Sequence, residues 1–557
     1  MPSKTKYIFV SGGVISGLGK GVTAGAIAFL LKSHGLKVTT VKCDAYVNID
    51  AGTIRPQEHG EVFVTEDGIE TDQDLGHYER FLHENLKRAN YITLGQIFQE
   101  VIRRERNFEY HGEDVEVVPD IPNEMIRRFR LAAKETGAEV VIIEIGGTVG
   151  EYQNILFLEA NRLMKFRDND PVLHIHVAYL PTPKHIGEMK SKPVQTSVRL
   201  LNQTMIQPDF LVCRAEKPID APRRARLSIF CNVSKEDIIS NPYVGSIYEV
   251  PTVFKEQDFD QKILTKLGIK KPVSKIFSQW QAMLARSKSA KKTVKIGLVG
   301  KYQKIGDYTL PDAYVCVVEA VKHAAWSLNL KPEIVWFDAE EIEKGKQNLN
   351  ELLQVGGVIV PQGWGSRGVE GKIKAIQFVR EHRIPYLGLC FGMQMAVIEF
   401  ARNVMGLSKA NSEEANVKTP YPVIHIMPNQ KEYLAKHQYG GTIRLGAWPC
   451  KLIDKTMAKK LYQQFGWLKD GQTQVAERHR HRYEFNLKYK DQFEKNGLRI
   501  AGISPDGKLV EVIELDQKLH PFFIGVQFHP EYKSRPLSPH PLFIGLIKTA
   551  HGEKFGR

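Results

Sequence analysis

Short apolar runs alternate along the chain with longer segments that carry a helical spacing of apolar and polar positions. The runs predict strands at Tyr7–Val10, Val38–Lys42, Glu139–Ile145, Val172–Tyr179 and Phe210–Cys213. The longer segments predict helices at Thr93–Arg106, Pro122–Glu135 and Pro222–Phe230. Alternating strands and helices are typical of parallel sheets covered by helices. We therefore expect an α/β protein with two doubly wound domains.

A basic segment near the middle of the chain interrupts this alternation. Residues 270–275 read KKPVSK, a helix-like stretch follows, and a new unit opens at Val294 with VKIGLVG. We therefore expect one domain at 1–270, a linker at 271–293 and a second domain at 294–557. Each domain is large but plausible as one α/β unit.

The bulk composition is that of an ordinary globular protein, with 557 residues, 42% hydrophobic and 25% charged. We find no apolar run of membrane-spanning length and no signal-peptide pattern, so we expect a cytoplasmic protein without a membrane partner. The six cysteines are scattered and form no CxxC pair, so neither a disulfide framework nor a zinc knuckle is indicated.

The formal net charge of +14 leaves two kinds of anionic partner open. Nucleic acid is one alternative, and the basic run ERHRHRYE at 477–484 fits it. The other basic residues are dispersed, and no DNA- or RNA-binding module is present. Nucleotides need only a few converging lysines and arginines. We predict small nucleotides and no nucleic acid.

Residues 11–23 read SGGVISGLGKGVT, between a predicted strand and a helical segment. This layout is typical of a phosphate-binding loop, in which backbone N–H groups of 17–21 cradle phosphates beside Lys20. The usual spacing G-x-x-x-x-G-K-[ST] fails, because Val14 and Gly21 stand where the first glycine and the magnesium-holding Ser or Thr belong. A glycine-rich turn without a ligand is the alternative.

Two carboxylates are candidates for the metal that the loop itself cannot hold. Asp74 ends the acidic stretch EDGIETDQD, and Glu144 ends an apolar strand before a glycine loop. The carboxyl ends of strands are where open α/β sheets bind ligands, and carboxylates with phosphate oxygens suit Mg²⁺. We predict Asp74 and Glu144 as magnesium ligands. A solvated acidic loop is the alternative for the stretch at 66–74.

A second basic cluster, GEMKSKPVQ, lies at 187–195. Lys190 and Lys192 are two apart, so in an extended run they would point the same way and could bind a second polyphosphate. Arginines of the following predicted helix could add charge, namely Arg223, Arg224 and Arg226. A charged surface turn is the alternative.

Five stretches within residues 6–250 together resemble the synthetase domain of the CTP synthase family, which carries this variant phosphate loop. They are YIFVSGGVISGLGKG, VKCDAYVNIDAGTIRPQEHGEVFVTEDGIETDQDLGHYERF, IIEIGGTVG, GEMKSKPVQ and RARLSIFCNV. The resemblance implies magnesium at Asp74 and Glu144 and an active-site lysine at Lys42. It implies ATP contacts by Gly17, Leu18, Gly19, Lys20, Gly21, Val22, Asp74 and Val244. It implies UTP or CTP contacts by Ser16, Glu151, Tyr152, Gln153, Lys190, Ser191, Lys192, Pro193, Val194, Gln195 and Arg226.

A different chemistry is indicated where an apolar run enters GLCFGMQ at 388–394. The pattern Gly-x-Cys-x-Gly places Cys390 on a nucleophile elbow at a helix N-terminus, although an inert buried cysteine is the alternative. His529 is a candidate base, and Glu531 is the group that would orient it. Backbone N–H groups after Cys390 and within PQGWG at 361–365 could form an oxyanion hole.

These motifs, over about 294–535, resemble the class I glutamine amidotransferases. The resemblance implies catalysis by Cys390, His529 and Glu531. It implies glutamine contacts by Gly363, Phe391, Gly392, Met393, Gln394, Glu414 and Arg482.

Some positions depart from the pattern of these families. Gly17 replaces a serine of the phosphate loop, Arg226 replaces a lysine, and Gln362 replaces a glycine near the oxyanion site. The triplet at 151–153 is Glu-Tyr-Gln instead of Asp-Ile-Glu, and the loop at 302–310 is longer than usual.

Taken together, the resemblance implies ATP-dependent amination of UTP to CTP with ammonia from glutamine, through a 4-phosphorylated UTP. It further implies a homotetramer, activation by GTP and feedback inhibition by CTP. Three alternatives stay open. They are a related amidoligase acting on a corrin or other carboxylate, a deviant-loop ATPase switch of the partition type, and a degenerate paralogue that binds nucleotides without turnover.

Overall fold

The structure is a computed structural model that describes residues 4–55, 60–272, 274–301, 304–305, 308–309, 311–427, 430–436 and 440–553. Internal contacts divide the chain into two units. We call Met1–Asp50 with Asp74–Leu284 the N-terminal unit, and Ala51–Gln73 with Ala285–Arg557 the C-terminal unit. The segment at 51–73 thus groups with the C-terminal unit, although it lies inside the first domain predicted from the sequence. The domain boundaries expected at 270 and 294 remain predictions from the sequence.

Seven parallel strands form the sheet of the N-terminal unit, in the order β5-β2-β6-β1-β7-β8-β9. The strands are β1 (Lys6–Gly13), β2 (Val38–Asp44), β5 (Tyr91–Thr93), β6 (Val140–Ile145), β7 (Val172–Tyr179), β8 (Phe210–Ala215) and β9 (Ile238–Pro242). All five strands predicted from the sequence are present. The strand order reverses beside β1, and open sheets bind ligands outside the carboxyl ends at such a point.

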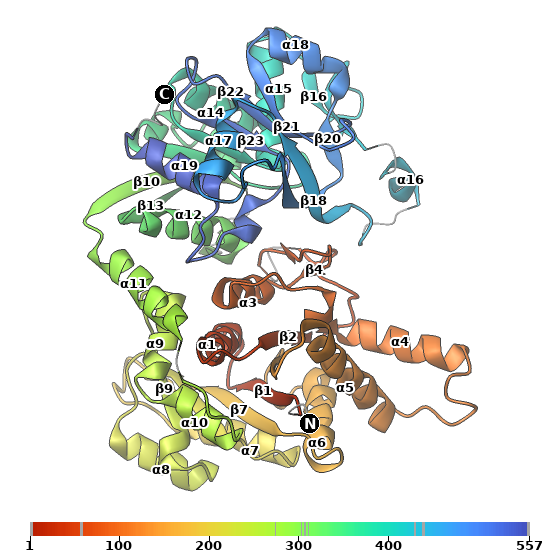
Figure 1. Ribbon diagram of the computed structural model, residues 1–557, viewed down its shortest axis with the longest axis vertical. Helices are drawn as coiled ribbons and strands as arrows, with labels where there is room; N and C mark the ends of the chain where they lie inside the picture. The colour runs from red at the N-terminus through yellow and green to blue at the C-terminus, as the bar shows by residue number, and fades with distance from the viewer. Residues whose placement is uncertain are drawn as a thin grey trace. The chain divides into compact units, whose positions relative to one another are not determined.

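Helices cover both faces of this sheet, which is why its strands are almost continuously apolar. Figure 1 shows the sheet between α1 and α5, and Phe9 of β1 packs edge-on against Phe129 of α5 with ring centroids 5.7 Å apart. The helices are α1 (Lys20–Ser33), α3 (Asp74–Leu82), α4 (Leu94–Arg106), α5 (Val117–Thr136), α6 (Ile155–Phe166), α7 (Lys192–Gln203), α8 (Ala221–Cys231), α9 (Val250–Lys255) and α10 (Phe259–Lys266). The three predicted helices correspond to α4, α5 and α8.

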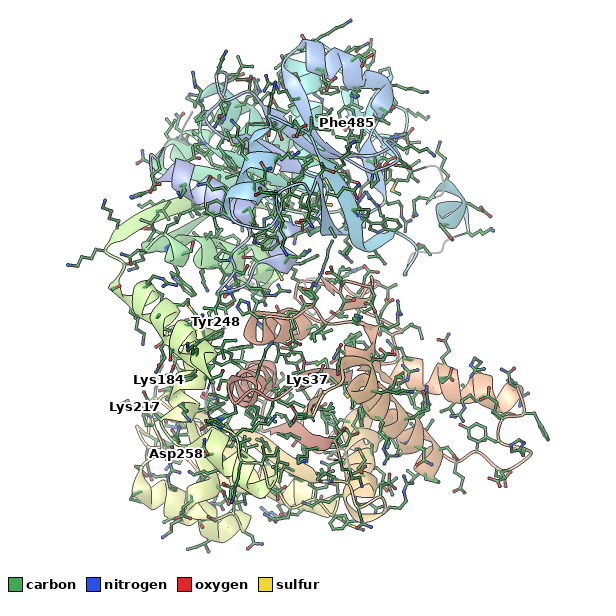
Figure 2. All side chains as sticks on the ribbon, viewed as in Figure 1. Lys37, Lys184, Lys217, Tyr248, Asp258 and Phe485 are labelled. Carbon is green, nitrogen blue, oxygen red and sulfur yellow. The ribbon has the colours of Figure 1, made fainter. Side chains whose placement is uncertain are left out.

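The predicted linker contains a long helix, α11 (Lys275–Ser289). The first part of α11 packs into the N-terminal unit through Trp280, whose buried ring lies 4.2 Å from that of Phe29. The indole nitrogen of Trp280 donates a hydrogen bond to the carbonyl oxygen of Tyr248, which Figure 2 labels beside this helix. This half of the linker is therefore part of a hydrophobic core.

The C-terminal unit is built on a nine-stranded mixed sheet, in the order β13-β10-β14-β15-β23-β22-β21-β18-β19. The first five strands of that order are parallel and the others pair antiparallel. The strands are β10 (Lys292–Gly300), β13 (Leu330–Asp338), β14 (Gly357–Val360), β15 (Tyr386–Leu389), β18 (Arg444–Leu452), β19 (Gln474–His481), β21 (Leu498–Ile503), β22 (Val510–Leu515) and β23 (Phe523–Val526). The predicted α/β class with two doubly wound domains is thus confirmed.

Two apolar clusters lie on the two faces of this sheet. The helices around it are α12 (Val315–Ser327), α13 (Ala339–Glu343), α14 (Val369–Glu381), α15 (Phe391–Asn403), α16 (Gln430–Ala435), α17 (Met457–Gln464), α18 (Lys490–Lys495) and α19 (Pro541–Ala550). A small sheet of β16 (Ala410–Ser412), β17 (Tyr421–Ile426) and β20 (Tyr483–Phe485) adds Phe485, labelled in Figure 2, against Phe493 of α18.

Short strands complete the C-terminal unit. They are β3 (Phe63–Val64) with β4 (Glu70–Thr71), and β11 (Lys304–Ile305) with β12 (Tyr308–Thr309). The longer loop noted at 302–310 lies partly outside the described residues. Across the described ranges, none of the helices combines the length and the apolar character needed to cross a membrane.

Candidate active sites

The loop after β1 joins the central strand of the N-terminal unit to α1, which begins at Lys20. The Lys20 side chain is buried, and its ammonium group donates a hydrogen bond of 2.8 Å to the carbonyl oxygen of Gly147 in the loop after β6. Burial lowers the pKa of Lys20. A buried lysine at a helix N-terminus is stabilised by an anion at the same place, so the geometry suits a phosphate group.

Asp74 occupies the space of the side chain that is missing at Gly21. A Cβ atom added to Gly21 would collide with the carboxylate of Asp74, the first residue of α3. In the common phosphate loop this position is a Ser or Thr that holds magnesium. The carboxylate of Asp74, from α3, therefore lies where the Ser or Thr side chain of the common phosphate loop would be.

Asp74 and Glu144 converge on a single ammonium group, that of Lys42. Lys42 Nζ donates hydrogen bonds to Asp74 Oδ2 and, at 3.1 Å, to Glu144 Oε1. The phenol of Tyr78 donates to the other oxygen of Glu144. Burial, followed by the negative charge of Asp74, raises the pKa of Glu144 to about 7. The structure thus brings Lys42 into contact with the two carboxylates that were predicted together as magnesium ligands.

These carboxylates fit a divalent cation that binds together with a ligand. Oxygen donors are what Mg²⁺ prefers, and it usually keeps waters and substrate phosphates as further ligands. The buried carboxylate of Glu144 and the half-buried carboxylate of Asp74 together carry more negative charge than Lys42 alone compensates, and a dication would offset it. Over the described part of the chain, no group of three or more His, Cys, Asp or Glu side chains forms a metal cage. Phosphate oxygens would have to complete the site.

The residues predicted to bind UTP or CTP follow the carboxyl ends of neighbouring strands. Ser16 lies after β1, residues 151–153 lie after β6, and residues 190–195 span the end of the loop after β7 and the first turn of α7. Val244, predicted to contact ATP, follows β9. Because the strands are parallel, these segments share one edge of the sheet. Most of their side chains are exposed or half-buried.

One expectation about this edge was wrong. Lys190 and Lys192 are not in one extended run, because α7 begins at Lys192 with Pro193 in its first turn. Proline has its backbone fixed for this helix position and favours a helix start there. Arg223 pairs with Glu188, and Arg224 donates to backbone carbonyl groups. Arg226 lies on α8 with its guanidinium over the ring of Phe230.

The C-terminal unit contains the predicted elbow. Cys390 joins β15 to α15 with a φ of 50° and a ψ of −99°, a backbone conformation that non-glycine residues rarely adopt. A Cβ atom on Gly392 would collide with the carbonyl oxygen of Val360. Glycine is therefore required for the close approach of α15 to β14. The thiol is brought to the carboxyl edge of the sheet, at the start of a helix.

His529 lies beside Cys390 because their strands are neighbours. Leu389 of β15 and Val526 of β23 are register partners in parallel strands, so both residues follow the same edge. His529 Nδ1 is 2.7 Å from Glu531 Oε1. Burial opposes a charged imidazole, but Glu531 and then Cys390 outweigh it and raise the pKa of His529 to about 10. The arrangement matches a nucleophile, a base and a group that orients the base.

A small pocket adjoins this pair. The loop at 361–365, which follows β14, forms one wall, and Gly365 N–H donates a hydrogen bond of 2.6 Å to Glu414 Oε1. Burial raises the pKa of Glu414. The predicted residues that line the pocket are Gly363, Cys390, Phe391, Gln394, Glu414, Arg482 and His529.

Other predicted residues act from outside the pocket lining. Gly392 packs against β14, and the side chain of Met393 lies in the hydrophobic core. Glu531 contacts the ring of His529 instead of the pocket. The sequence reasoning named Gln362 only as a departure from the family. It did not single out four further lining residues, Trp364, Arg480, His481 and Tyr483, nor Gln527, whose amide lies 3.6 Å from Cys390 Sγ. Arg480, His481 and Tyr483 belong to the basic run at 477–484, from which only Arg482 was predicted as a glutamine contact.

Comparison with known proteins matches two regions of the chain to two families. Residues 6–269 match the family model for the CTP synthase N-terminus, and residues 309–549 match that for class I glutamine amidotransferases. A CTP synthase of Sulfolobus acidocaldarius is 47% identical over 98% of this chain and 99% of its own length. One of Caldanaerobacter subterraneus is 48% identical over 98% of both. Among solved structures, the glutaminase domain of Trypanosoma brucei CTPS with bound acivicin is 35% identical, covering 47% of this chain and 96% of that one, with a TM-score of 0.42.

A phosphate loop on one doubly wound sheet and a class I amidotransferase elbow on another define a glutamine-dependent ligase. The identity over nearly the whole chain then selects one family of such ligases. The chain belongs to the CTP synthase family. This membership decides against the corrin-type amidoligase and the ATPase switch that the sequence had left open.

Proposed function

We propose that this protein makes CTP from UTP, with ATP as the activating substrate and glutamine as the nitrogen source. One observation supports this more than any other. The chain carries both the Asp74–Lys42–Glu144 cluster beside a phosphate loop and a strained Cys390 beside His529. A nucleotide-binding switch needs the first site alone, and a glutaminase needs only the second. A reaction that uses both consumes ATP and glutamine together.

In the C-terminal unit, Cys390 attacks the side-chain amide carbon of glutamine. A C–S bond forms and the carbonyl electron pair moves to oxygen. When the carbonyl reforms, the C–N bond breaks, and His529 gives its proton to the departing nitrogen, which leaves as ammonia. Water, losing a proton to His529, then cleaves the thioester to glutamate. Glu531 keeps the imidazole oriented through the 2.7 Å contact.

The predicted glutamine contacts keep their roles in this proposal. Glu414 and Arg482 are charged groups of the pocket and suit the ammonium and carboxylate groups of an amino acid. Gly363 and the turn after Cys390 supply backbone N–H groups for the oxygen that becomes negatively charged.

In the N-terminal unit, the 4-oxygen of UTP attacks the terminal phosphorus of ATP, and ADP leaves. Ammonia then adds to carbon 4, and the phosphate departs with the former oxygen, which yields CTP. Lys20 is placed to neutralise phosphate charge at the start of α1. Asp74 and Glu144 would hold Mg²⁺, which when bound offsets the charge of the transferred phosphoryl group. Lys42 would hold both carboxylates in position.

The remaining roles are proposed on the basis of family membership. ATP would contact 17–22 and Val244, and UTP or the inhibitor CTP would contact Ser16, 151–153, 190–195 and Arg226. GTP would activate the enzyme, four copies would form the active tetramer, and the reaction would take place in the cytoplasm.

The test follows the conversion of UTP to CTP by ultraviolet absorbance, with ATP, magnesium and either glutamine or ammonium. We expect the wild-type protein to use both nitrogen sources and Cys390→Ala to use ammonium alone. CTP formation from neither source, with ATP still bound, would refute the assignment and favour a degenerate paralogue. CTP from ammonium but not glutamine in the wild-type protein would place the loss in the C-terminal unit, where Gln362 departs from the family.

A further inference from the structure

Two buried lysines lie directly behind the loop that forms one wall of the glutamine pocket. Lys372 of α14 is fully buried, and its Nζ atom donates to the carbonyl oxygen of Pro361 at 2.7 Å and to that of Gln362 at 3.4 Å. Lys301, which directly follows β10, donates from Nζ to the carbonyl oxygens of Trp364, Gly365 and Arg367. Five carbonyl groups of residues 361–367 are therefore held by two amines.

This pinning fixes the direction of the N–H groups on the same peptide planes. In a trans peptide the carbonyl of one residue and the N–H of the next point to opposite sides. Trp364 illustrates this, because its carbonyl faces Lys301 and the following N–H, that of Gly365, donates to Glu414 in the pocket. By the same geometry, the carbonyl of Gln362 faces Lys372, so the N–H of Gly363 points away from Lys372.

The N–H group of Gly363 is available for a ligand. Gly363 lines the pocket together with Cys390. Within the ranges that the structure describes, no protein group accepts a hydrogen bond from this N–H. A pre-oriented backbone donor beside a nucleophile is what stabilises the oxyanion of acyl transfer.

The two amines are also held in place from the side of the nucleophile. Both lie over the ring of Phe391, the residue after the nucleophile, at 4.7 Å for Lys301 Nζ and 5.2 Å for Lys372 Nζ. Burial lowers the pKa of Lys301 to about 8 and that of Lys372 well below its ordinary value. The positioning does not depend on charge, since an uncharged amine still donates hydrogen bonds to carbonyl groups.

We propose that Lys301 and Lys372 are positioning residues for glutamine hydrolysis, which hold the peptides of the 361–367 loop so that Gly363 N–H meets the oxyanion formed when Cys390 attacks. This inference rests on the proposed glutaminase activity and adds two residues to it. Neither amine touches the substrate. Both act through the backbone of the loop.

The experiment compares Lys301→Met and Lys372→Met with Lys374→Met, an exposed lysine on the same helix as Lys372. Two rates are measured on the full-length protein, namely the steady-state hydrolysis of glutamine and the alkylation of Cys390 by iodoacetamide. Alkylation needs an accessible thiolate but no oxyanion hole. We expect kcat to fall by about 100-fold in the first two variants, which is typical for loss of one oxyanion donor. KM and the alkylation rate should change less than about threefold, and Lys301→Arg should recover part of kcat.

An unchanged kcat in Lys301→Met would overturn the proposal, and this variant carries the test if Lys372→Met fails to fold. A parallel loss of hydrolysis and alkylation would also overturn it, because the lysines would then support the pocket as a whole. If the wild-type protein and Lys374→Met are alkylated but hydrolyse no glutamine, the proposed function itself fails.

Discussion

The imidazole of His529 and the carboxylate of Glu531 lie 2.7 Å apart, although they are only two residues apart in the chain. Pro530 stands between them and begins a short 3₁₀ turn, so the backbone brings the two side chains together. Both side chains are almost fully buried. The negative charge of Glu531 therefore acts on the imidazole with little screening by water.

Replacing this carboxylate by an amide should disable the base. In Glu531→Gln the pKa of His529 loses its main support and falls from about 10, because burial alone favours the neutral ring. We expect kcat for glutamine hydrolysis to fall by about 100-fold, within the range of general acid–base contributions. The pH dependence of Cys390 alkylation should shift at the same time. A variant with normal hydrolysis would show that Glu531 does not orient the base.

Substituting alanine for Gly392 should remove the elbow and leave the N-terminal unit intact. The new Cβ atom would collide with the carbonyl oxygen of Val360, so α15 would have to move away from β14. We expect glutamine-dependent CTP synthesis to be lost and ammonium-dependent synthesis to stay within about twofold of wild type. Loss of both activities would mean that the change unfolds more than the glutaminase site.

The elements of both sites were predicted because their signals are local. Cys390 was found from the spacing of two glycines, Asp74 from an acidic stretch, and Glu144 from its place at the end of an apolar run. The amines of Lys301 and Lys372 were not found, because their partners are carbonyl groups brought close only by the fold. The contact of Gln362 with Glu61 was not predicted for the same reason, because the two residues are 301 positions apart in the sequence. Lys192 was misplaced because the helix-starting signal of Pro193 was not weighed against the extended pattern.

The contact between Gln362 and Glu61 predicts a stability effect. Gln362 Nε2 donates a hydrogen bond of 2.6 Å to Glu61 Oε1, while the other oxygen of Glu61 accepts from the N–H of Cys316. A hydrogen bond to a charged group contributes about 1.5–3 kcal/mol, so Gln362→Gly should destabilise the C-terminal unit by about 2 kcal/mol. A double-mutant cycle with Glu61→Gln, followed by urea unfolding, measures the coupling. Strictly additive effects would contradict it.

Trp280 should contribute to the stability of the N-terminal unit in spite of its place in the predicted linker. Its ring is fully buried against Phe29, and its N–H is satisfied by Tyr248. Removing a buried tryptophan side chain costs about 3–5 kcal/mol, which is the loss expected for Trp280→Ala. The matched control is Gln279→Ala, because that neighbour is exposed on the same helix. Equal melting temperatures for the two variants would show that α11 is only a connector.

Acid should destabilise the N-terminal unit through a buried histidine next to the phosphate loop. The ring nitrogens of His176 lie 2.9 Å from Ser11 Oγ and 2.7 Å from Ser197 Oγ. Burial, followed by the charge of Lys20, lowers the pKa of His176 to about 3. The unfolded chain binds this proton near pH 6.5 and the folded chain does not, so this contribution to stability is complete above pH 6.5 and is lost as the pH falls toward 3.

The free energy of unfolding should therefore fall by about 1.4 kcal/mol for each pH unit below 6.5 on account of His176. His174, whose pKa burial lowers as well, adds to the slope. In His176→Gln the slope of the unfolding free energy against pH should decrease by about 1.4 kcal/mol per pH unit, the amount that corresponds to one proton. The slope is measured by urea unfolding at pH 7, 6 and 5, together with hydrogen exchange of the N-terminal unit. His185→Gln, at an exposed histidine, is the control and should leave the slope unchanged. An unaltered slope in His176→Gln would mean that the ring is protonated in the folded protein, and the neutral chain from Ser11 to Ser197 would have to be abandoned.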